Sequence, residues 1–160
     1  MTSERARNPF TGTALGGRVL SASQLPLFLI RAPRNYGVLT TTGRSTGKQR
    51  RRCVRIVRSE DTAYVVAIKG EHTGWLKNLR RDPDVQIRLR GGSFNGVARE
   101  LTPRGEETEG REAYCEPVGW FEYLEYAMWR RGRPTPARIR DLHRAWFDEG
   151  AGVAVDVAGH

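Results

Sequence analysis

The clearest pattern of apolar and polar positions lies in the middle of the chain. Val85, Ile87 and Leu89 alternate with polar residues, which is the period of a strand with one buried face. Other runs there are rich in β-branched and aromatic residues and are bounded by glycine or polar turn residues. The pattern therefore predicts strands over residues 36–42, 51–58, 62–69, 85–89 and 94–101, with a last strand over 152–158.

Helical patterns flank these strands. Thr135 and Pro136 form a helix start, because a hydroxyl N-cap is followed by proline at the first helical position, and Gly150 ends the same segment. An apolar stretch that begins at Val19 ends before Pro33, since proline disfavours helical geometry in the residue before it. We predict helices over residues 19–30, 74–81, 103–114, 119–131 and 136–147.

Short consecutive strands around one helix, flanked by further helices, predict an α+β domain built on an antiparallel barrel. Residues 1–17 are polar and predict a flexible arm, and residues 18–160 predict a single domain with a helical C-terminal segment. We see neither an apolar run of membrane-spanning length nor a secretory signal, so we expect a cytoplasmic protein. Cys53 and Cys115 provide no disulfide framework and no metal-ligand spacing, so we expect no metal.

The net charge of the chain raises the question of an anionic partner. The 160 residues carry 27 basic and 18 acidic side chains, a net charge of +9, which favours an anionic partner. The only lysines are Lys48, Lys69 and Lys77, and this preference for arginine is also what a GC-rich genome produces. Nucleic acid is not the expected partner, because no helix-turn-helix, zinc or RNA-stacking pattern accompanies the arginines.

The strongest local signal is a turn bounded by Gly43 and Gly47. Arginine makes forked hydrogen bonds to phosphate and carboxylate, and glycine lets backbone amides approach an anion. The segment predicts either an anion-binding hairpin or a solvated hairpin tip whose charges protect an edge strand. The turn brings together four basic side chains and two hydroxyls: Arg44, Lys48, Arg50, Arg52, Ser45 and Thr46.

Two further groups of residues could face a ligand. Trp75 and Asn78 are three residues apart on one helix face, where an indole can cover a flat heterocycle and an amide can bind its edge. Tyr123 and Tyr126 share a face in the same way and could orient a substrate or supply a proton. The alternative in each case is that the aromatic residues pack the core.

At this point the sequence resembles a known family, the F420-dependent (deazaflavin-dependent) nitroreductases of actinobacteria. The resemblance covers residues 37–126 and rests on the order of four motifs. These motifs are Leu-Thr-Thr-Thr-Gly-Arg-Ser-Thr-Gly-Lys-Gln-Arg at residues 39–50, Trp75-x-x-Asn-Leu79, Asp82-Pro-x-Val85 and Ala98-Arg-Glu-Leu101.

The resemblance implies a split β-barrel of the FMN-binding-like type that holds coenzyme F420 (8-hydroxy-5-deazaflavin) at the barrel edge. Residues of the hairpin would hold the phosphate and oligoglutamate tail, and the next strand would run alongside the cofactor. The end of a later strand and the helix after it would line and close over the deazaflavin ring, with two tyrosines on the substrate side. Carried over in that order, the residues are Arg44, Ser45, Thr46, Gly47 and Arg50; Arg51, Arg52, Cys53 and Val54; Ala67, Ile68 and Lys69; Gly74, Trp75 and Asn78; and Tyr123 and Tyr126.

The implied function is an F420-dependent oxidoreductase that transfers hydride from reduced F420 to an unsaturated, quinone-like or nitro acceptor. Ile68 stands where the family often has a small hydroxyl residue, which motivates the alternative of an F420 carrier without catalysis. An FMN-dependent oxidoreductase of the same fold is a second alternative. We expect a small-molecule substrate and no nucleic acid, and we leave open a homodimer and a peripheral contact with a membrane through the apolar residues before Pro33.

Overall fold

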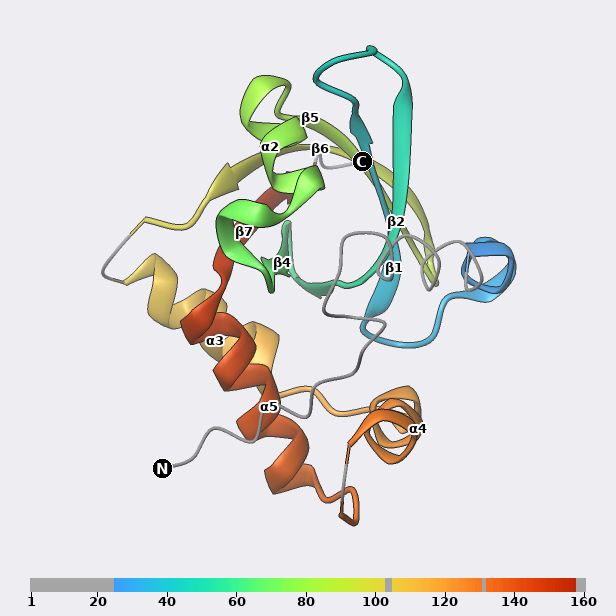
Figure 1. Cartoon of the computed structure of the whole chain (residues 1–160), viewed down its shortest axis with the longest axis vertical. Coiled ribbons are helices and arrows are strands. Elements are labelled where there is room, and N and C mark those ends of the chain that lie inside the picture. Colours follow the sequence, from blue (N-terminus) through green and yellow to red (C-terminus); the bar gives the residue numbers. More distant parts are fainter. Residues whose placement is uncertain (1–24, 103–104, 131, 158–160) are drawn as a thin grey trace.

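The computed structural model describes residues 25–102, 105–130 and 132–157, and the predicted N-terminal arm lies outside these residues. Figure 1 shows a strongly curled sheet with helices around it. The strands are β1 (Tyr36–Thr42), β2 (Gln49–Arg55), β3 (Val57–Ser59), β4 (Thr62–Ala67), β5 (Asp84–Leu89), β6 (Gly92–Glu100) and β7 (Ala151–Val157). They form one sheet in the order β2-β1-β5-β6-β7-β4-β3, and each neighbouring pair is antiparallel.

The connection at Ile56 explains why the sheet curls. β2 and β3 stand at opposite edges of the sheet, yet only Ile56 separates them in the chain. Its amide donates to the Asn35 carbonyl at 3.0 Å, and its side chain is buried in the barrel. One residue spans only a few ångströms, so the two edges must lie side by side. This is the geometry of a barrel, and it confirms the predicted α+β antiparallel barrel.

Alternate residues of the strands fill the barrel interior. The interior cluster takes Leu39 from β1, Val65 from β4, Ile87 from β5 and Val155 from β7, all nearly inaccessible to solvent. The helix α2 (Gly74–Arg81) closes one end of the barrel with three apolar side chains: Trp75, Leu76 and Leu79. The barrel is therefore a packed core, and a ligand must bind at its rim or outer surface.

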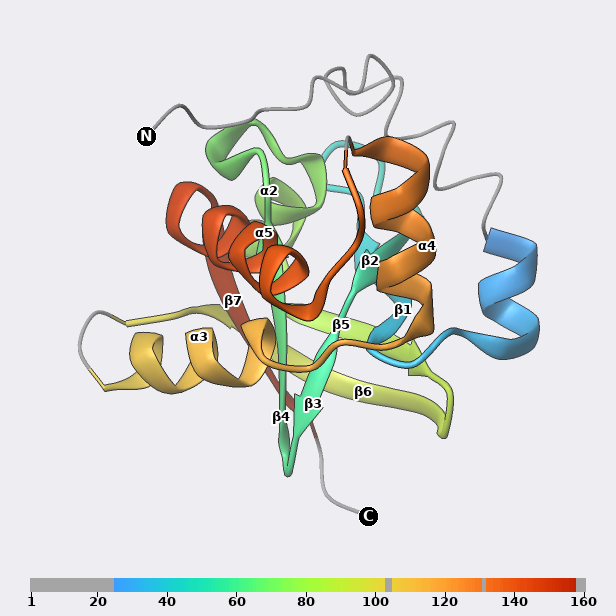
Figure 2. The ribbon, with the colours of Figure 1, turned by 90° about the horizontal axis from the view of Figure 1, so that it is seen from below.

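The other helices cover the outer face of the sheet in two groups (Figure 2). In the first group, α3 (Glu106–Cys115) and α5 (Pro136–Glu149) pack on β3, β4 and β7 through Tyr114 and Phe147. In the second, a helix over residues 25–31 and α4 (Trp120–Trp129) pack on β1. Phe28 and Phe121 contact Tyr36 there, with ring centroids 6.1 and 4.7 Å from the tyrosine ring. None of the described helices has the length and apolar character that a membrane span requires.

Element boundaries differ from the sequence predictions in a few places. The predicted strand 51–58 begins at Gln49 and is split at Ile56 into β2 and β3, because the chain crosses there from one sheet edge to the other. The predicted strand 62–69 ends at Ala67, where the short 3-10 helix η1 (Gly70–His72) follows. The start predicted for α5 is confirmed, since the Thr135 hydroxyl accepts from the Arg138 amide at 3.2 Å.

Candidate functional site

Strand register places the basic residues of β2 on two faces. Arg52 pairs with Leu39 of β1, and Arg50 pairs with the next inward position, Thr41. Leu39 and Val54 lie in or against the barrel core, so Arg50 and Arg52 share their face at the barrel rim. Arg51 and the half-buried Cys53 alternate to the outer face. The hairpin therefore presents arginines on both sides of an edge strand.

The turn between β1 and β2 is compact and glycine-dependent. The Gly43 amide donates to the Lys48 carbonyl, and the Gly47 amide donates to the Gly43 carbonyl, both at 2.8 Å. Gly47 has a φ of +68°, which favours glycine. A Cβ on Gly43 would lie 3.0 Å from the Thr46 hydroxyl and 3.5 Å from the Arg50 Nε. A hydroxyl and a guanidinium therefore converge on this backbone, as the sequence predicted.

Arg44 and Asn78 join the turn to α2. The Arg44 guanidinium donates to the Asn78 Oδ1 at 3.0 Å and to the Gly74 carbonyl at 3.4 Å, and the Arg44 amide donates to the same Oδ1 at 3.3 Å. Asn78 is buried, and its amide donates to the Thr41 hydroxyl at 3.1 Å. One amide side chain thus fixes the hairpin, β1 and α2 relative to one another.

The start of α2 carries polar groups that are open to a ligand. The Thr73 hydroxyl is buried and has no hydrogen-bond partner among the described residues, and it does not cap the helix that follows it. A Cβ on Gly74 would meet no atom within 4 Å. The first turn of α2 contains no acidic residue. An oriented hydroxyl, an accessible helix start and the nearby Arg44 suit an anionic group such as phosphate.

The charged residues in the sequence around the hairpin are all basic. Residues 31–58 contain nine basic side chains and no acidic one. In the described part of the chain no ion pair joins a carboxylate to Arg44, Lys48 or Arg50, although the hairpin is exposed. Several other exposed arginines do pair with carboxylates: Arg80, Arg99, Arg111, Arg140 and Arg144. Arg44, Lys48 and Arg50 therefore have no carboxylate partner among the described residues.

Of the residues predicted to surround a ring, Gly74 and Asn78 contact the hairpin through Arg44. Ala67 is buried at the end of β4, whereas Ile68 is 49% exposed and Lys69 is exposed. Trp75 is only 9% exposed and belongs to the barrel core, which is the alternative role that the sequence offered for it. A ligand could therefore reach only the edge of its indole, while Ile68 presents an open apolar surface.

The predicted tyrosines lie on a different element. Tyr123 and Tyr126 are half-buried on α4, which packs on the outer face of β1. Across the described residues, no hydrogen bond or ring contact joins either tyrosine side chain to the hairpin or to α2. The structure joins Arg44 to Gly74 and Asn78, and it does not bring these two tyrosines into contact with them.

A buried ion pair that sequence reasoning missed connects β2 to α4. Arg55 is 5% exposed, and its guanidinium pairs with Glu122 of α4. It also donates to the carbonyls of Tyr114 and Pro117 at 2.7 and 2.8 Å. Glu122 is 2% exposed and accepts a further bond from Asn35 at 3.1 Å. The two acidic residues inside an otherwise aromatic and apolar helix were the signal that could have revealed this pair.

One turn later on α4, Glu125 makes a second, partly buried polar contact. It accepts a hydrogen bond from the Tyr36 hydroxyl at 2.5 Å. Burial raises the pKa of the Glu125 carboxyl and, with the charge of Glu125, the pKa of the Tyr36 phenol. These contacts hold both acidic residues of α4 against the sheet.

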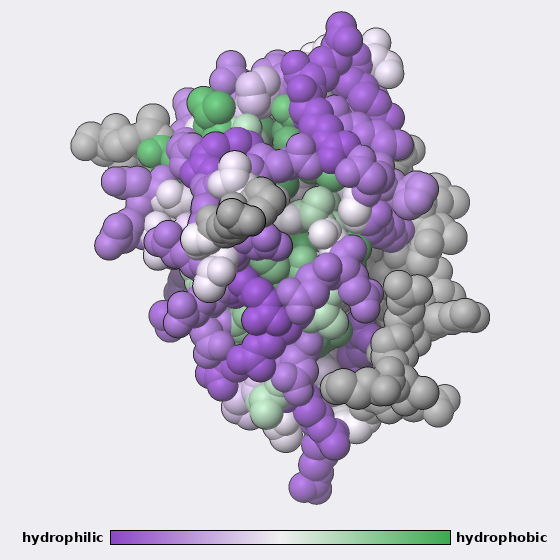
Figure 3. Space-filling view, turned by 90° about the vertical axis from the view of Figure 1, so that its left-hand side faces the viewer, coloured by the Kyte–Doolittle hydropathy of each residue, from purple (hydrophilic) through white to green (hydrophobic). Residues whose placement is uncertain are grey.

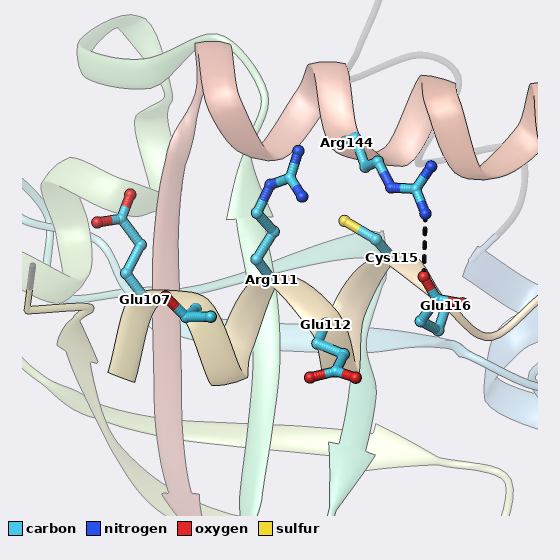
Figure 4. Close-up of a pocket in the computed structure, with 7 residues that line it drawn as sticks. Glu107, Arg111, Glu112, Cys115, Glu116 and Arg144 are labelled. Carbon is cyan, nitrogen blue, oxygen red and sulfur yellow. Dashed lines mark hydrogen bonds and ion pairs between the residues drawn. The ribbon is translucent and has the colours of Figure 1, made fainter. Parts of the chain in front are cut away.

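A hollow of about 460 Å³ lies between α3 and α5, on a different part of the molecule from the hairpin (Figure 4). The Arg144 guanidinium donates to the Glu116 carboxylate there at 3.1 Å. Burial raises the pKa of the Cys115 thiol to about 11, so the thiol is protonated and unreactive at neutral pH. In the described ranges, no group of three or more potential ligands could hold a metal ion. The lining residues are Glu107, Thr108, Arg111, Glu112, Cys115, Glu116 and Arg144.

Comparison with known proteins gives a consistent result. Residues 29–140 match the family described as F420H(2)-dependent quinone reductase. A protein of Mycobacterium tuberculosis named F420H(2)-dependent quinone reductase is 28% identical over 105 residues, which cover 64% of this chain and 70% of that protein. A reductase of the same name from Mycobacterium bovis aligns with the same identity and coverage.

Solved structures support the fold. The F420-H2 dependent reductase FDR-A superposes with a TM-score of 0.50 at 22% identity, covering 76% of this chain and 94% of that one. A hypothetical protein from Mycobacterium tuberculosis also gives 0.50, at 18% identity over 87% of this chain and 81% of that one. The split barrel is therefore confirmed. Because the family match spans most of the chain, including the hairpin, α2 and α4, the protein belongs to the F420H(2)-dependent quinone reductase family.

Proposed function

We propose that the chain is an F420-dependent reductase that transfers hydride from reduced F420 to a quinone-like acceptor, with the tail of the cofactor held by the β1–β2 hairpin. Within the described residues, no carboxylate pairs with Arg44, Lys48 or Arg50, and the buried Thr73 hydroxyl beside Gly74 has no hydrogen-bond partner; this observation carries the assignment of the site. A phosphate and an oligoglutamate tail supply the anionic groups that such a cluster requires.

The residues present fit the cofactor. The Thr46 hydroxyl and the Arg50 guanidinium converge near Gly43 and can hold a phosphate, while Thr73 and the start of α2 offer further donors. Reduced F420, when bound, supplies the hydride, and the protein supplies position and electrostatics. Arg44 has a second task, since its contacts to Asn78 and Gly74 hold the hairpin against α2.

The ring-side residues of the proposal lie at the end of β4 and at the start of α2. Exposed Ile68 offers an apolar surface to a flat ring, with Ala67 and Lys69 beside it. Gly74, Asn78 and the accessible edge of Trp75 limit the site on the α2 side, and residues 51–54 run along β2. Tyr123 and Tyr126 remain candidates for the acceptor side, and Tyr126 is the candidate proton donor.

Fluorescence titration with F420 tests the cofactor site. We expect F420 to bind, and we expect Arg50→Ala to weaken binding at least about tenfold, because one forked charge-assisted contact contributes about 1.5–3 kcal/mol. Arg90→Ala is the matched control, because it removes the same charge from an exposed turn on another hairpin. Equal binding by wild type and Arg50→Ala would remove the hairpin from the site, and absence of F420 binding would overturn the function.

The alternative functions predict different outcomes of the same experiments. An FMN enzyme would bind FMN in preference to F420, and a carrier would bind reduced F420 without passing hydride to any quinone. The family match favours the reductase over both. Tyr126→Phe tests the proton donor, because single-turnover oxidation by a quinone should slow in this variant and unchanged turnover would exclude the role.

The proposal also covers the substrate class and the oligomeric state of the chain. We expect a small-molecule substrate, as the family description implies. A homodimer is the second expectation, and light scattering of the purified chain measures it directly. A mass equal to the 18.1 kDa of a single chain would exclude the dimer.

A further inference from the structure

The side chain of Asn78 makes its hydrogen bonds inside the protein. Its Oδ1 accepts from the Arg44 amide at 3.3 Å and from the Arg44 Nη1 at 3.0 Å, and its Nδ2 donates to the Thr41 hydroxyl at 3.1 Å. A carboxamide oxygen has two lone pairs, so both are in use, and one N–H remains. Asn78 is only 6% exposed. The sequence predicted that this amide could bind the edge of a ring, and these contacts leave little of it for a ligand.

The same contacts orient the Arg44 guanidinium. Nη1 donates to the Asn78 Oδ1 and, at 3.4 Å, to the Gly74 carbonyl, which together occupy both of its hydrogens. Within the described residues no partner takes the Nε or Nη2 hydrogens, and the side chain is exposed. Two adjacent guanidinium nitrogens are what arginine uses for forked hydrogen bonds to phosphate or carboxylate. Asn78 therefore holds one end of the guanidinium and leaves an anion-binding edge open.

Thr41 extends this arrangement to a second basic side chain of the hairpin. It lies on β1 directly opposite Arg50 of β2, so the two residues share one face of the sheet. Thr41 is 2% exposed, and a ligand therefore has no access to its hydroxyl. Its bond to Asn78 ties α2 to the point of the ladder from which Arg50 projects. One buried amide thus connects α2 to the positions of both arginines.

The tip of the hairpin suits a strongly charged ligand group. It forms the upper end of the molecule in Figure 1, and hydrophilic residues cover most of this end (Figure 3). Lys48 and Arg50 are exposed there, and no carboxylate of the described residues pairs with either of them. The exposed apolar side chain of Ile68 belongs to another part of the chain, just after β4. A ligand with an anionic end and a flat ring would therefore meet different residues at its two ends.

We propose that Asn78 is a positioning residue for the phosphate end of the cofactor, and that Thr41 acts with it. Together they orient Arg44 and set the hairpin relative to α2. The inference rests on the proposed function, since that function places F420 at this site. In this assignment the Asn78 amide serves the anionic end and is not a contact of the deazaflavin ring. Loss of its contacts lowers the affinity for a ligand that carries the phosphate and tail, and it leaves the affinity for the bare ring unchanged.

Fluorescence titration with two ligands tests this division. The first is F420, and the second is its fragment FO, which has the deazaflavin ring and the ribityl chain but neither phosphate nor tail. Thr41→Val removes the hydroxyl that Asn78 uses, and it should weaken F420 binding about fivefold, the equivalent of one net hydrogen bond, without changing FO binding. Thr40→Val is the matched control, because Thr40 is the neighbouring threonine on the opposite face of β1. Thr41→Ser keeps the hydroxyl and should bind both ligands as the wild type does.

Replacement of Asn78 itself separates positioning from direct contact. Asn78→Ala removes all three hydrogen bonds and should weaken F420 binding at least about tenfold, again with little change for FO. Because Asn78 acts largely through Arg44, the double variant Arg44→Ala/Asn78→Ala should lose less F420 affinity than the two single losses combined. Thermal unfolding of each variant shows whether the barrel is intact.

Failure of this inference and failure of the proposed function give different results. If the wild type binds F420, any of three results overturns the inference and leaves the function: equal loss of F420 and FO affinity in Asn78→Ala, unchanged F420 binding in both Thr41→Val and Asn78→Ala, or equal affinity of the wild type for F420 and FO. If the wild type binds neither, calorimetric titration with inorganic pyrophosphate decides. Pyrophosphate binding that Thr41→Val weakens and Thr40→Val retains supports the positioning role and rejects the cofactor, whereas absence of pyrophosphate binding overturns both.

Discussion

Replacement of Arg55 by methionine removes the buried cation that joins β2 to α4. Arg55 and Glu122 are 5% and 2% exposed, so the carboxylate would be left buried without its counter-ion. The carbonyls of Tyr114 and Pro117 would lose their donors at 2.7 and 2.8 Å. Loss of one partner of a buried pair destabilises a protein by about 3–5 kcal/mol. For a chain of this size that corresponds to a fall in Tm of roughly 6–20 °C.

Thermal and urea unfolding measure this loss, and an exposed ion pair provides the comparison. Arg111→Met breaks the pair with Asp148, whose side chains are 40% and 55% exposed, and such pairs contribute about 0–1 kcal/mol. The double variant Arg55→Met/Glu122→Met should be more stable than Arg55→Met alone, because it removes the uncompensated charge. A loss below about 1 kcal/mol in Arg55→Met, or an additive loss in the double variant, would refute the reasoning.

Three further predictions follow from the helices and the sheet. His143 is buried, and desolvation lowers its pKa to about 3, so the unfolded state binds a proton that the folded state does not. The free energy of unfolding, measured with urea, should therefore fall by about 2 kcal/mol as pH decreases from 7 to 5. His143→Phe should abolish this dependence on pH. Thr135→Ala removes the N-cap of α5 and should cost about 1 kcal/mol, with Thr135→Ser close to wild type in the same assay. Cys115 is 1% exposed and its thiol pKa is about 11, so iodoacetamide should label it only after urea unfolds the chain, and labelling in the native state would contradict its burial.

Local signals in the sequence were sufficient to predict most of the fold. The alternation at residues 85–89 became β5, and the Thr135–Pro136 signal marked the start of α5. The break at Ile56 could not be predicted in this way, because it depends on which sheet edges meet, and that is decided by pairing between distant strands. Residues 51–58 have strand character throughout, so local propensity does not distinguish one strand from two.

The same distinction between local signals and distant contacts applies to the candidate site. The hairpin cluster was predictable because its residues are close in sequence, and Arg44 and Asn78 meet in the structure. The contacts of Glu122 and Glu125 were not, because they lie on a helix whose inward face is polar, contrary to the usual pattern. Aromatic spacing on α4 indicated a packed face, whereas Leu124 and Met128 point to solvent. Only the tertiary contacts decide which side of such a helix is buried.

The position of β7 has a consequence for the order of folding. β7 lies between β6 and β4, although it is the last strand in the chain. Until residues 151–157 are available, the β2-β1-β5-β6 and β4-β3 segments have no strand to join them, and each presents an open edge. A nascent chain that ends at Gly150 therefore contains two sheet segments that are linked only at Ile56, and their open edges are prone to pair with other chains. Barrel closure in this protein must therefore wait until residues 151–157 are synthesised, and stop codons that remove β7 are expected to yield aggregates rather than a smaller folded domain.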